Sequence, residues 1–115
     1  MCAVAPALIG MLASAPAQGR LDDTSDKRSG HGLVRACEAE QAAAASWCAA
    51  YLMGIADTLT AFGEGGHKGG LCGAAYQIED LGETFLTWMR KHPQFLDLDM
   101  LAGASLALRE RWPCR

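Results

Sequence analysis

One long helical pattern that contains two cysteines constrains this fold more than any other feature of the sequence. At about 100° of rotation per residue, a set of mostly apolar side chains falls within about 60° of Cys48. This face consists of Cys37, Gln41, Ala44, Cys48, Tyr51, Leu52, Ile55, Leu59 and Phe62. The pattern predicts one helix from about Leu33 to Phe62, with both thiols on the side that faces the core.

Two further helices are predicted after a loop at residues 63–70, which holds five glycines in eight residues and is expected to be mobile. The first runs from about Tyr76 to Lys91 and ends at His92-Pro93, and the second runs from Leu98 to Arg111. Their core sides are expected to carry Ile78, Leu81, Phe85, Trp88, Met89, Leu98, Leu101, Ala102, Ser105, Leu108 and Arg109, with Asp97 or Asp99 as an N-cap. The sequence therefore predicts an all-α domain of three main helices.

The four cysteines from Cys37 onward permit three disulfide pairings, and the reach of the chain discriminates among them. On one continuous helix, about 16 Å separates the Cα atoms of Cys37 and Cys48, whereas a disulfide needs them within about 7 Å. A link from Cys37 to Cys72 would require ten residues to span about 37 Å when they extend at most about 34 Å. We therefore predict the pairs Cys48 to Cys72 and Cys37 to Cys114, with free buried thiols in a cytosolic protein as the alternative.

The N-terminal segment indicates export. Residues 1–17 form an uncharged, alanine-rich run that ends in Ala15-Pro16-Ala17, which is typical of a secretory signal peptide although no Lys or Arg precedes the run. The run is too short and too interrupted by proline to predict a membrane span; the alternative is an uncleaved tail. Cleavage removes Cys2 and leaves an even number of cysteines, which suits the periplasm. Residues 18–32 are predicted to be a flexible leader and residues 33–115 one helical domain.

Composition and motifs argue against several classes of function. The net charge is −3 with no basic patch, so a nucleic-acid partner is not expected. The cysteines are assigned to disulfides and the three histidines are dispersed, so the sequence predicts no catalytic residues, no metal site and no cofactor. We expect Trp47, Trp88 and Trp112 to pack in the core rather than to form a ligand cage.

Several of these residues together resemble a known family. They are Cys37, the segment Trp47-Cys48-Ala49-Ala50-Tyr51-Leu52-Met53-Gly54-Ile55-Ala56-Asp57, Cys72, His92-Pro93 and the terminal Trp112-Pro113-Cys114. The arrangement resembles the Rap/Tai immunity proteins, whose fold is described as HdeA-like. The resemblance implies a periplasmic protein that binds and inhibits a peptidoglycan amidase delivered by type VI secretion. The alternative is a structural or chaperone-like periplasmic module with no toxin partner. The family usually has proline after its third cysteine, where this chain has Gly73.

The glycine-rich loop supplies the candidate partner-binding residues. The loop at residues 63–70 displays Glu64, His67 and Lys68, and the family resemblance makes it the candidate plug for an enzyme cleft; the alternative is a solvated connector. Asp57 lies about 180° from Cys48 and is either a solvated carboxylate or a partner contact. A strip of small side chains near Asp57 suggests a homodimer contact as a further hypothesis. Its members are Ala42, Ala43, Ser46, Ala49, Ala50 and Met53.

Overall fold

The computed structural model describes residues 27–115 as an all-α domain. Its elements are α2 (Gly30–Gln41), α3 (Cys48–Glu64), α4 (Ile78–Lys91), the 3-10 helix η2 (Pro93–Phe95) and α5 (Met100–Arg111). Within this range the only extended pairings are two isolated bridges, Ser29–Asp99 and Leu71–Pro113. The predicted all-α fold class is confirmed, and residues 27–115 form four α-helices where the sequence predicted three.

The predicted signal peptide at residues 1–17 and most of the predicted leader at residues 18–32 lie outside the described residues. Helix α2 begins at Gly30, before the predicted start at Leu33. Ser29 caps this helix, because its Oγ accepts a hydrogen bond of 3.4 Å from the backbone N–H of Gly32. At the start of α5, Asp99 Oδ2 accepts a hydrogen bond of 2.9 Å from Leu101 N, so the prediction of Asp99 as an N-cap is confirmed.

The prediction of one helix from Leu33 to Phe62 was wrong, because the chain turns between Gln41 and Cys48. The backbone N–H groups of Ala43 and Ala44 bond to the carbonyls of Glu40 and Ala39, at 3.0 and 2.9 Å. These two hydrogen bonds form a Schellman motif, in which the residue after the C-cap adopts a left-handed conformation. Ala43 does so with φ +65°, although glycine usually occupies this position. The alanine run therefore ends a helix rather than continuing one.

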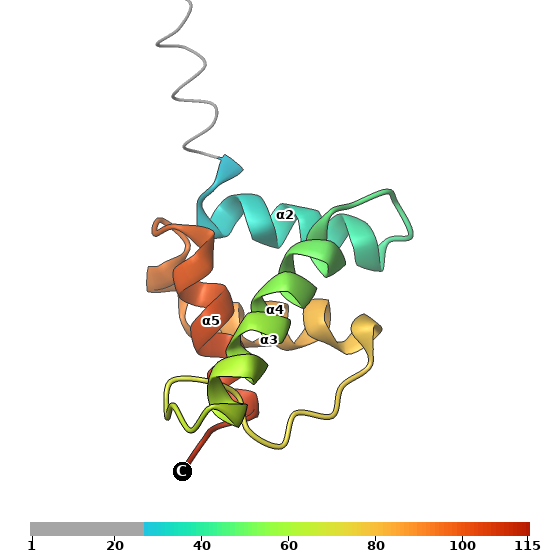
Figure 1. Cartoon of the computed structure of the whole chain (residues 1–115). Coiled ribbons are helices and arrows are strands. Elements are labelled where there is room, and N and C mark those ends of the chain that lie inside the picture. The colour runs from blue at the N-terminus through green and yellow to red at the C-terminus, as the bar shows by residue number, and fades with distance from the viewer. Residues whose placement is uncertain (1–26) are drawn as a thin grey trace, which may run out of the picture.

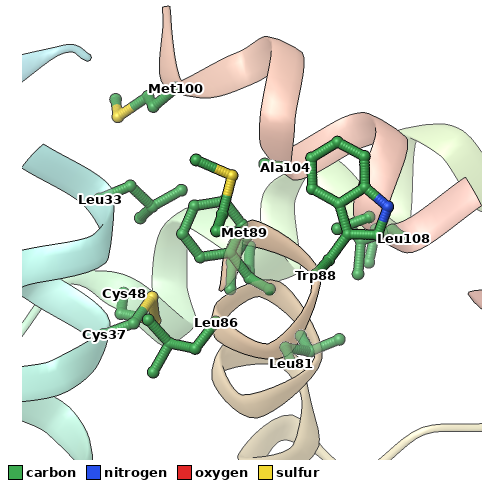
Figure 2. Close-up of a cluster of buried hydrophobic side chains, with 14 of the residues drawn as sticks. Leu33, Cys37, Cys48, Leu81, Leu86, Trp88, Met89, Met100, Ala104 and Leu108 are labelled. Atoms are coloured by element: carbon green, nitrogen blue, oxygen red, sulfur yellow. A yellow bond between two sulfur atoms is a disulfide. The ribbon is translucent and has the colours of Figure 1, made fainter. Parts of the chain in front are cut away.

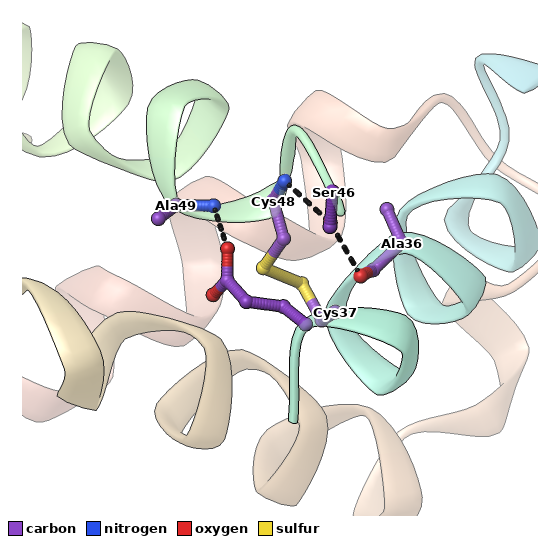
Figure 3. Close-up of a disulfide and its surroundings, with 6 residues drawn as sticks. Ala36, Cys37, Ser46, Cys48 and Ala49 are labelled. Carbon is purple, nitrogen blue, oxygen red and sulfur yellow. Dashed lines mark hydrogen bonds between the residues drawn. A yellow bond between two sulfur atoms is a disulfide. The ribbon is translucent and has the colours of Figure 1, made fainter. Parts of the chain in front are cut away.

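The N-terminus of α3 is held by side chains of α2 and of the turn (Figure 3). Ser46 Oγ accepts a 3.0 Å hydrogen bond from Cys48 N and donates one of 2.6 Å to the carbonyl of Ala36. Glu40 Oε2 accepts a 2.9 Å bond from Ala49 N. These two side chains satisfy backbone N–H groups that a new helix leaves without partners. The corner between α2 and α3 is therefore closed by polar contacts as well as by a disulfide.

Both predicted disulfide pairs were wrong. The structure links Cys37 to Cys48 and Cys72 to Cys114, with Cα atoms 4.9 and 4.8 Å apart. The pairing of Cys37 with Cys48 was excluded on the assumption of a straight helix between them. Because the chain reverses at residues 42–47, the two sulfurs meet at the corner instead. With Cys48 used in this way, Cys72 is left to join the C-terminal tail.

The four helices pack against one another around a single core, and every pair of them is in contact. Helix α3 crosses in front of α4, with α2 above them and α5 beside them (Figure 1). Figure 2 shows the buried side chains that converge from all four helices, including Leu33, Cys48, Met89 and Leu108. As predicted, α4 buries Leu81, Phe85, Trp88 and Met89. The predicted core positions Ile78, Leu98, Leu101 and Arg109 were wrong, because each of them is exposed. Gln41 and Ala44, which were predicted on the core face of the first helix, are exposed as well.

Candidate partner-binding surface

The loop that follows α3 is hydrogen-bonded through much of its length despite its glycines. His67 N donates to the carbonyl of Phe62 at 3.0 Å, and Gly70 N donates to that of His67 at 3.1 Å. Leu71, which is 1% exposed, then donates its N–H to the carbonyl of Leu59 at 2.8 Å and inserts into the core. The loop is therefore fixed where it leaves α3 and where it returns to the same helix.

The C-terminal tail holds the returning end of the loop. Cys72 is linked to Cys114, and its N–H donates to the carbonyl of Trp112 at 3.2 Å. Leu71 forms an isolated bridge with Pro113. Figure 1 shows this loop beside the C-terminal segment at the lower end of α3. We call residues 63–72 with residues 112–114 the clasp, because a disulfide and backbone hydrogen bonds close it.

Two glycines of the clasp allow a close approach between backbone segments. A Cβ on Gly70 would collide with backbone atoms of Gly63 and Leu59, and one on Gly63 would collide with the carbonyl of Leu71. In contrast, a Cβ on Gly69 would meet nothing. Some of the loop's glycines are thus required for packing rather than for freedom of movement.

The structure places three predicted binding residues, Glu64, His67 and Lys68, on the exposed surface of the clasp or at its edge. Glu64 is the last residue of α3. The imidazole of His67 packs against the ring of Phe62, with ring centres 5.6 Å apart. Lys68 follows at the exposed turn of the loop.

The fourth predicted residue, Asp57, shares a shallow groove with Glu64. This groove has a volume of about 400 Å³ and is also lined by Thr60 and Tyr76. The hydroxyl of Tyr76 donates to Asp57 Oδ1 at 3.3 Å. Partial burial raises the pKa of Tyr76, and the charge of Asp57 raises it further. The groove thus presents two carboxylates, which suit a basic or hydrogen-bond-donating group.

An apolar stripe along α3 lies outside the core, although the sequence pattern predicted its members to be core residues. Tyr51, Ile55 and Leu59 are only partly buried and Phe62 is 51% exposed, whereas the buried face of α3 consists of Cys48, Leu52 and Ala56. Tyr51, Ile55 and Leu59 line a groove of about 610 Å³ together with Leu101 of α5, which is 49% exposed. The rotation angles from Cys48 apply only within α3, and there the core covers a narrower face of the helix than they suggested.

The tryptophans divide into three environments. Trp88 is 8% exposed, donates to Glu110 Oε2 at 2.6 Å and stacks on His92, so core packing is confirmed for it. Trp112 is partly buried and packs against Tyr76 with ring centres 5.3 Å apart. The prediction for Trp47 was wrong, because its side chain is 45% exposed at the start of α3.

The three histidines lie in different parts of the described chain. Between residues 27 and 115, no group of three or more His, Cys, Asp or Glu side chains has the geometry to hold a metal ion. His31 contacts Asp97 at 3.0 Å, and His92 contacts the carbonyl of Trp88 at 2.9 Å, so both histidines lie outside the clasp. In the same part of the chain, no helix has both the length and the apolar character required to span a membrane.

The strip suggested for a homodimer does not form one helical face. Ala42 and Ala43 lie in the turn after α2, while Ser46 uses its hydroxyl to close the corner. Met53 packs against the core cluster. The broken helix therefore separates these side chains into different surroundings.

Comparison with known proteins identifies the family. The family model described as Rap1a immunity proteins matches residues 29–114, which include helices α2 to α5 and the two disulfides of the described residues. No curated protein and no solved structure matches the chain. The chain belongs to the Rap1a immunity protein family, whose members have a protein toxin as their partner.

Proposed function

We propose that this protein binds and inhibits a peptidoglycan amidase that type VI secretion delivers into the periplasm. The family match over residues 29–114 carries the proposal, since it covers the whole described helical domain. The resemblance noted in the sequence supplies the class of toxin. The two disulfides favour an oxidising compartment such as the periplasm, where a cell-wall enzyme would act.

In this proposal the clasp enters the active-site cleft of the amidase. Its exposed turn offers His67 and Lys68, and the neighbouring groove offers Asp57 and Glu64. A loop that is already held by a disulfide and by bonds to Leu59 and Trp112 loses little conformational entropy on binding. This feature favours an inhibitory loop over a solvated connector. Inhibition then requires recognition and steric blockage but no chemistry on the immunity protein itself.

The test combines the purified mature protein with the amidase toxin encoded beside its gene, where one is found. We expect the two proteins to co-purify, and we expect added immunity protein to stop the release of cleaved peptides from isolated cell walls. Full amidase activity in the presence of excess folded protein would contradict the proposed function.

The role of the clasp needs a separate variant. Replacing His67 and Lys68 together with alanine is expected to weaken inhibition by roughly 10-fold to 100-fold, as for central interface residues. The matched control replaces Arg90 and Lys91, two exposed residues at the end of α4, with alanine. If both double variants inhibit as well as the unaltered protein, the toxin binds elsewhere, and the immunity function stands without the clasp.

A further inference from the structure

The two disulfides differ in how readily a thiol in solution can reach them. Cys37 and Cys48 are each 0% exposed and lie among the buried side chains of the core (Figure 2). Cys72 is exposed and Cys114 is partly buried. Thiol–disulfide exchange requires the attacking sulfur to reach one sulfur of the bond, so its rate depends on access. A reductant can therefore attack the bond between Cys72 and Cys114 while the core stays closed.

The chain around Cys72 leaves one side of this disulfide uncovered. Gly73, the next residue, is exposed, and a Cβ built on it would meet nothing within 4 Å. The residues on either side of Cys114 are exposed as well. The sulfur of Cys114 lies against Gly63, because a Cβ on that glycine would be 3.1 Å from it. Cys72 is thus the more accessible of the two cysteines, and exchange would begin at its sulfur.

This disulfide constrains more than the loop of the clasp. Residues 72–77 connect the clasp to α4, and the C-terminal tail contacts this connection at two points. One is the disulfide at Cys72, and the other is the ring of Trp112, whose centre lies 5.3 Å from that of Tyr76. The same connection forms one wall of the shallow groove in which Tyr76 bonds to Asp57. One covalent bond therefore constrains both the clasp and this groove.

Few contacts would hold the tail on the clasp without the disulfide. Besides the ring contact of Trp112, these are the 3.2 Å hydrogen bond from Cys72 N to the Trp112 carbonyl and the isolated bridge between Leu71 and Pro113. Backbone hydrogen bonds near a chain end compete with water and open readily. Leu71 is 1% exposed and would stay in the core, so the loop would remain attached to α3. Reduction would therefore release the tail and residues 72–77 while the helices stay packed.

We propose that the disulfide between Cys72 and Cys114 is a redox-sensitive closure of the clasp, which a dithiol reductant opens while the core disulfide stays intact. A thiolate of the reductant bonds to Cys72 Sγ as the S–S bond breaks, and Cys114 leaves as a thiolate that takes up a proton. The second thiol of the reductant then displaces Cys72. Both cysteines end as thiols, with the two electrons and two protons that the reductant loses on becoming a disulfide.

The consequence for recognition rests on the proposed function. A clasp that is free to move must be ordered when it enters the cleft of the toxin, and this ordering opposes binding. The oxidised protein would therefore bind the amidase more tightly than the protein whose clasp is reduced.

The experiment incubates the folded mature protein with graded ratios of reduced to oxidised dithiothreitol, blocks free thiols with iodoacetamide and maps the labelled cysteines by mass spectrometry. We expect Cys72 and Cys114 to be labelled at a ratio roughly tenfold lower than the ratio that labels Cys37 and Cys48. NMR of the selectively labelled protein should show shifted amides in residues 63–77 and 112–115 and unchanged amides in α2 and α4. Labelling of all four cysteines together, labelling of the buried pair first, or unshifted clasp amides would overturn the proposal.

The matched control combines Cys72→Ala with Cys114→Ala, which removes the bond without any reductant or label. It should show the same shifted amides, and dithiothreitol at the selective ratio should not change them further. Freed of reductant, the selectively labelled protein and this variant should each inhibit the amidase roughly tenfold less well than the oxidised protein. Reduced protein that is reoxidised instead of labelled should recover full inhibition.

The two proposals fail in different ways. If the oxidised protein does not inhibit the amidase, the proposed function is wrong, while the labelling pattern and the clasp amides still decide whether the closure is redox-sensitive. If the oxidised protein inhibits and the selectively labelled protein inhibits equally well, the closure does not control recognition and this inference is overturned.

Discussion

The two disulfides occupy opposite kinds of environment. Cys37 and Cys48 are both fully buried, and they close a short ring with a sequence separation of 11. Cys72 is exposed and Cys114 partly buried, and they close a ring with a separation of 42. The first therefore belongs to the core and fixes the corner between two helices, whereas the second fixes the shape of a surface loop. Under the proposed function, one disulfide would serve the stability of the core and the other would shape the surface that meets the toxin.

The largest expected effects come from removing each disulfide in turn. Ring closure alone predicts a loss of about 3 kcal/mol for the short ring and about 4 kcal/mol for the long ring. However, replacing Cys37 and Cys48 with alanine also leaves a void in the core, which adds about 2 kcal/mol. We expect the buried pair to be the costlier one to lose, at about 5 kcal/mol in the free energy of unfolding, measured by urea denaturation.

The double replacement of Cys72 and Cys114 with alanine serves as the comparison. It should cost about 4 kcal/mol or less, because no buried sulfur is removed. It should also weaken toxin inhibition out of proportion to the loss of stability, since it frees the loop. If the exposed pair proves costlier to lose, ring size rather than burial sets the contribution of each disulfide, and the contrast above is wrong.

The next effect concerns the packing of the clasp. In Gly70→Ala the new Cβ would collide with backbone atoms of Gly63 and Leu59, which cannot move as a flexible side chain can. We expect a loss of about 2 kcal/mol in the free energy of unfolding and a displaced loop, visible as amide shift changes by NMR. Gly69→Ala is the matched control and should change stability by less than about 0.5 kcal/mol. Equal behaviour of the two variants would show that the close approach is not maintained in solution.

The helices that the sequence predicted well are those with strong amphipathic patterns and ordinary ends. Helix α4 ends at Lys91 as predicted, and its apolar stripe packs in the core as expected. The break between α2 and α3 was missed because alanine, the best helix former, occupies the left-handed position that normally signals an ending. The one local sign of a new helix was Ser46, which acts as a cap. Both wrong disulfide pairs followed from this single missed turn.

The exposed surface of the domain was harder to predict than its fold class. The sequence identified Glu64, His67 and Lys68 from the glycine-rich loop, and these residues are exposed in the structure. It could not identify the apolar stripe that ends at Phe62 or the exposed Trp47, because rotation angles do not show how wide a face the neighbouring helices cover. That width depends on tertiary packing, which involves all four helices at once.

A smaller effect tests the polar closure of the buried corner. Ser46→Ala removes both the cap on Cys48 N and the bond to the carbonyl of Ala36. We expect a loss of about 1–2 kcal/mol in the free energy of unfolding, with the disulfide still formed. Ser105→Ala is the control, since that hydroxyl only bonds to the carbonyls of Leu101 and Ala102 within its own helix. A cost below about 0.5 kcal/mol for Ser46→Ala would mean that the disulfide alone maintains the corner.

The smallest expected effect is a gain in the free energy of unfolding, and it tests the turn at residues 42–47 that the sequence pattern did not predict. Ala43 holds φ at +65°, a conformation that costs an alanine about 1–2 kcal/mol and costs glycine almost nothing. Glycine also gives the unfolded chain more conformational freedom, which favours unfolding by about 0.4–1 kcal/mol and offsets part of the relieved strain. We therefore expect Ala43→Gly to stabilise the protein by about 0.5–1 kcal/mol in urea denaturation, whereas Ala44→Gly, at a neighbouring position without positive φ, should destabilise it slightly. A loss of stability in Ala43→Gly would argue that one unbroken helix runs through residues 37–48 in solution. Such a helix would also hold Cys37 and Cys48 too far apart for a disulfide.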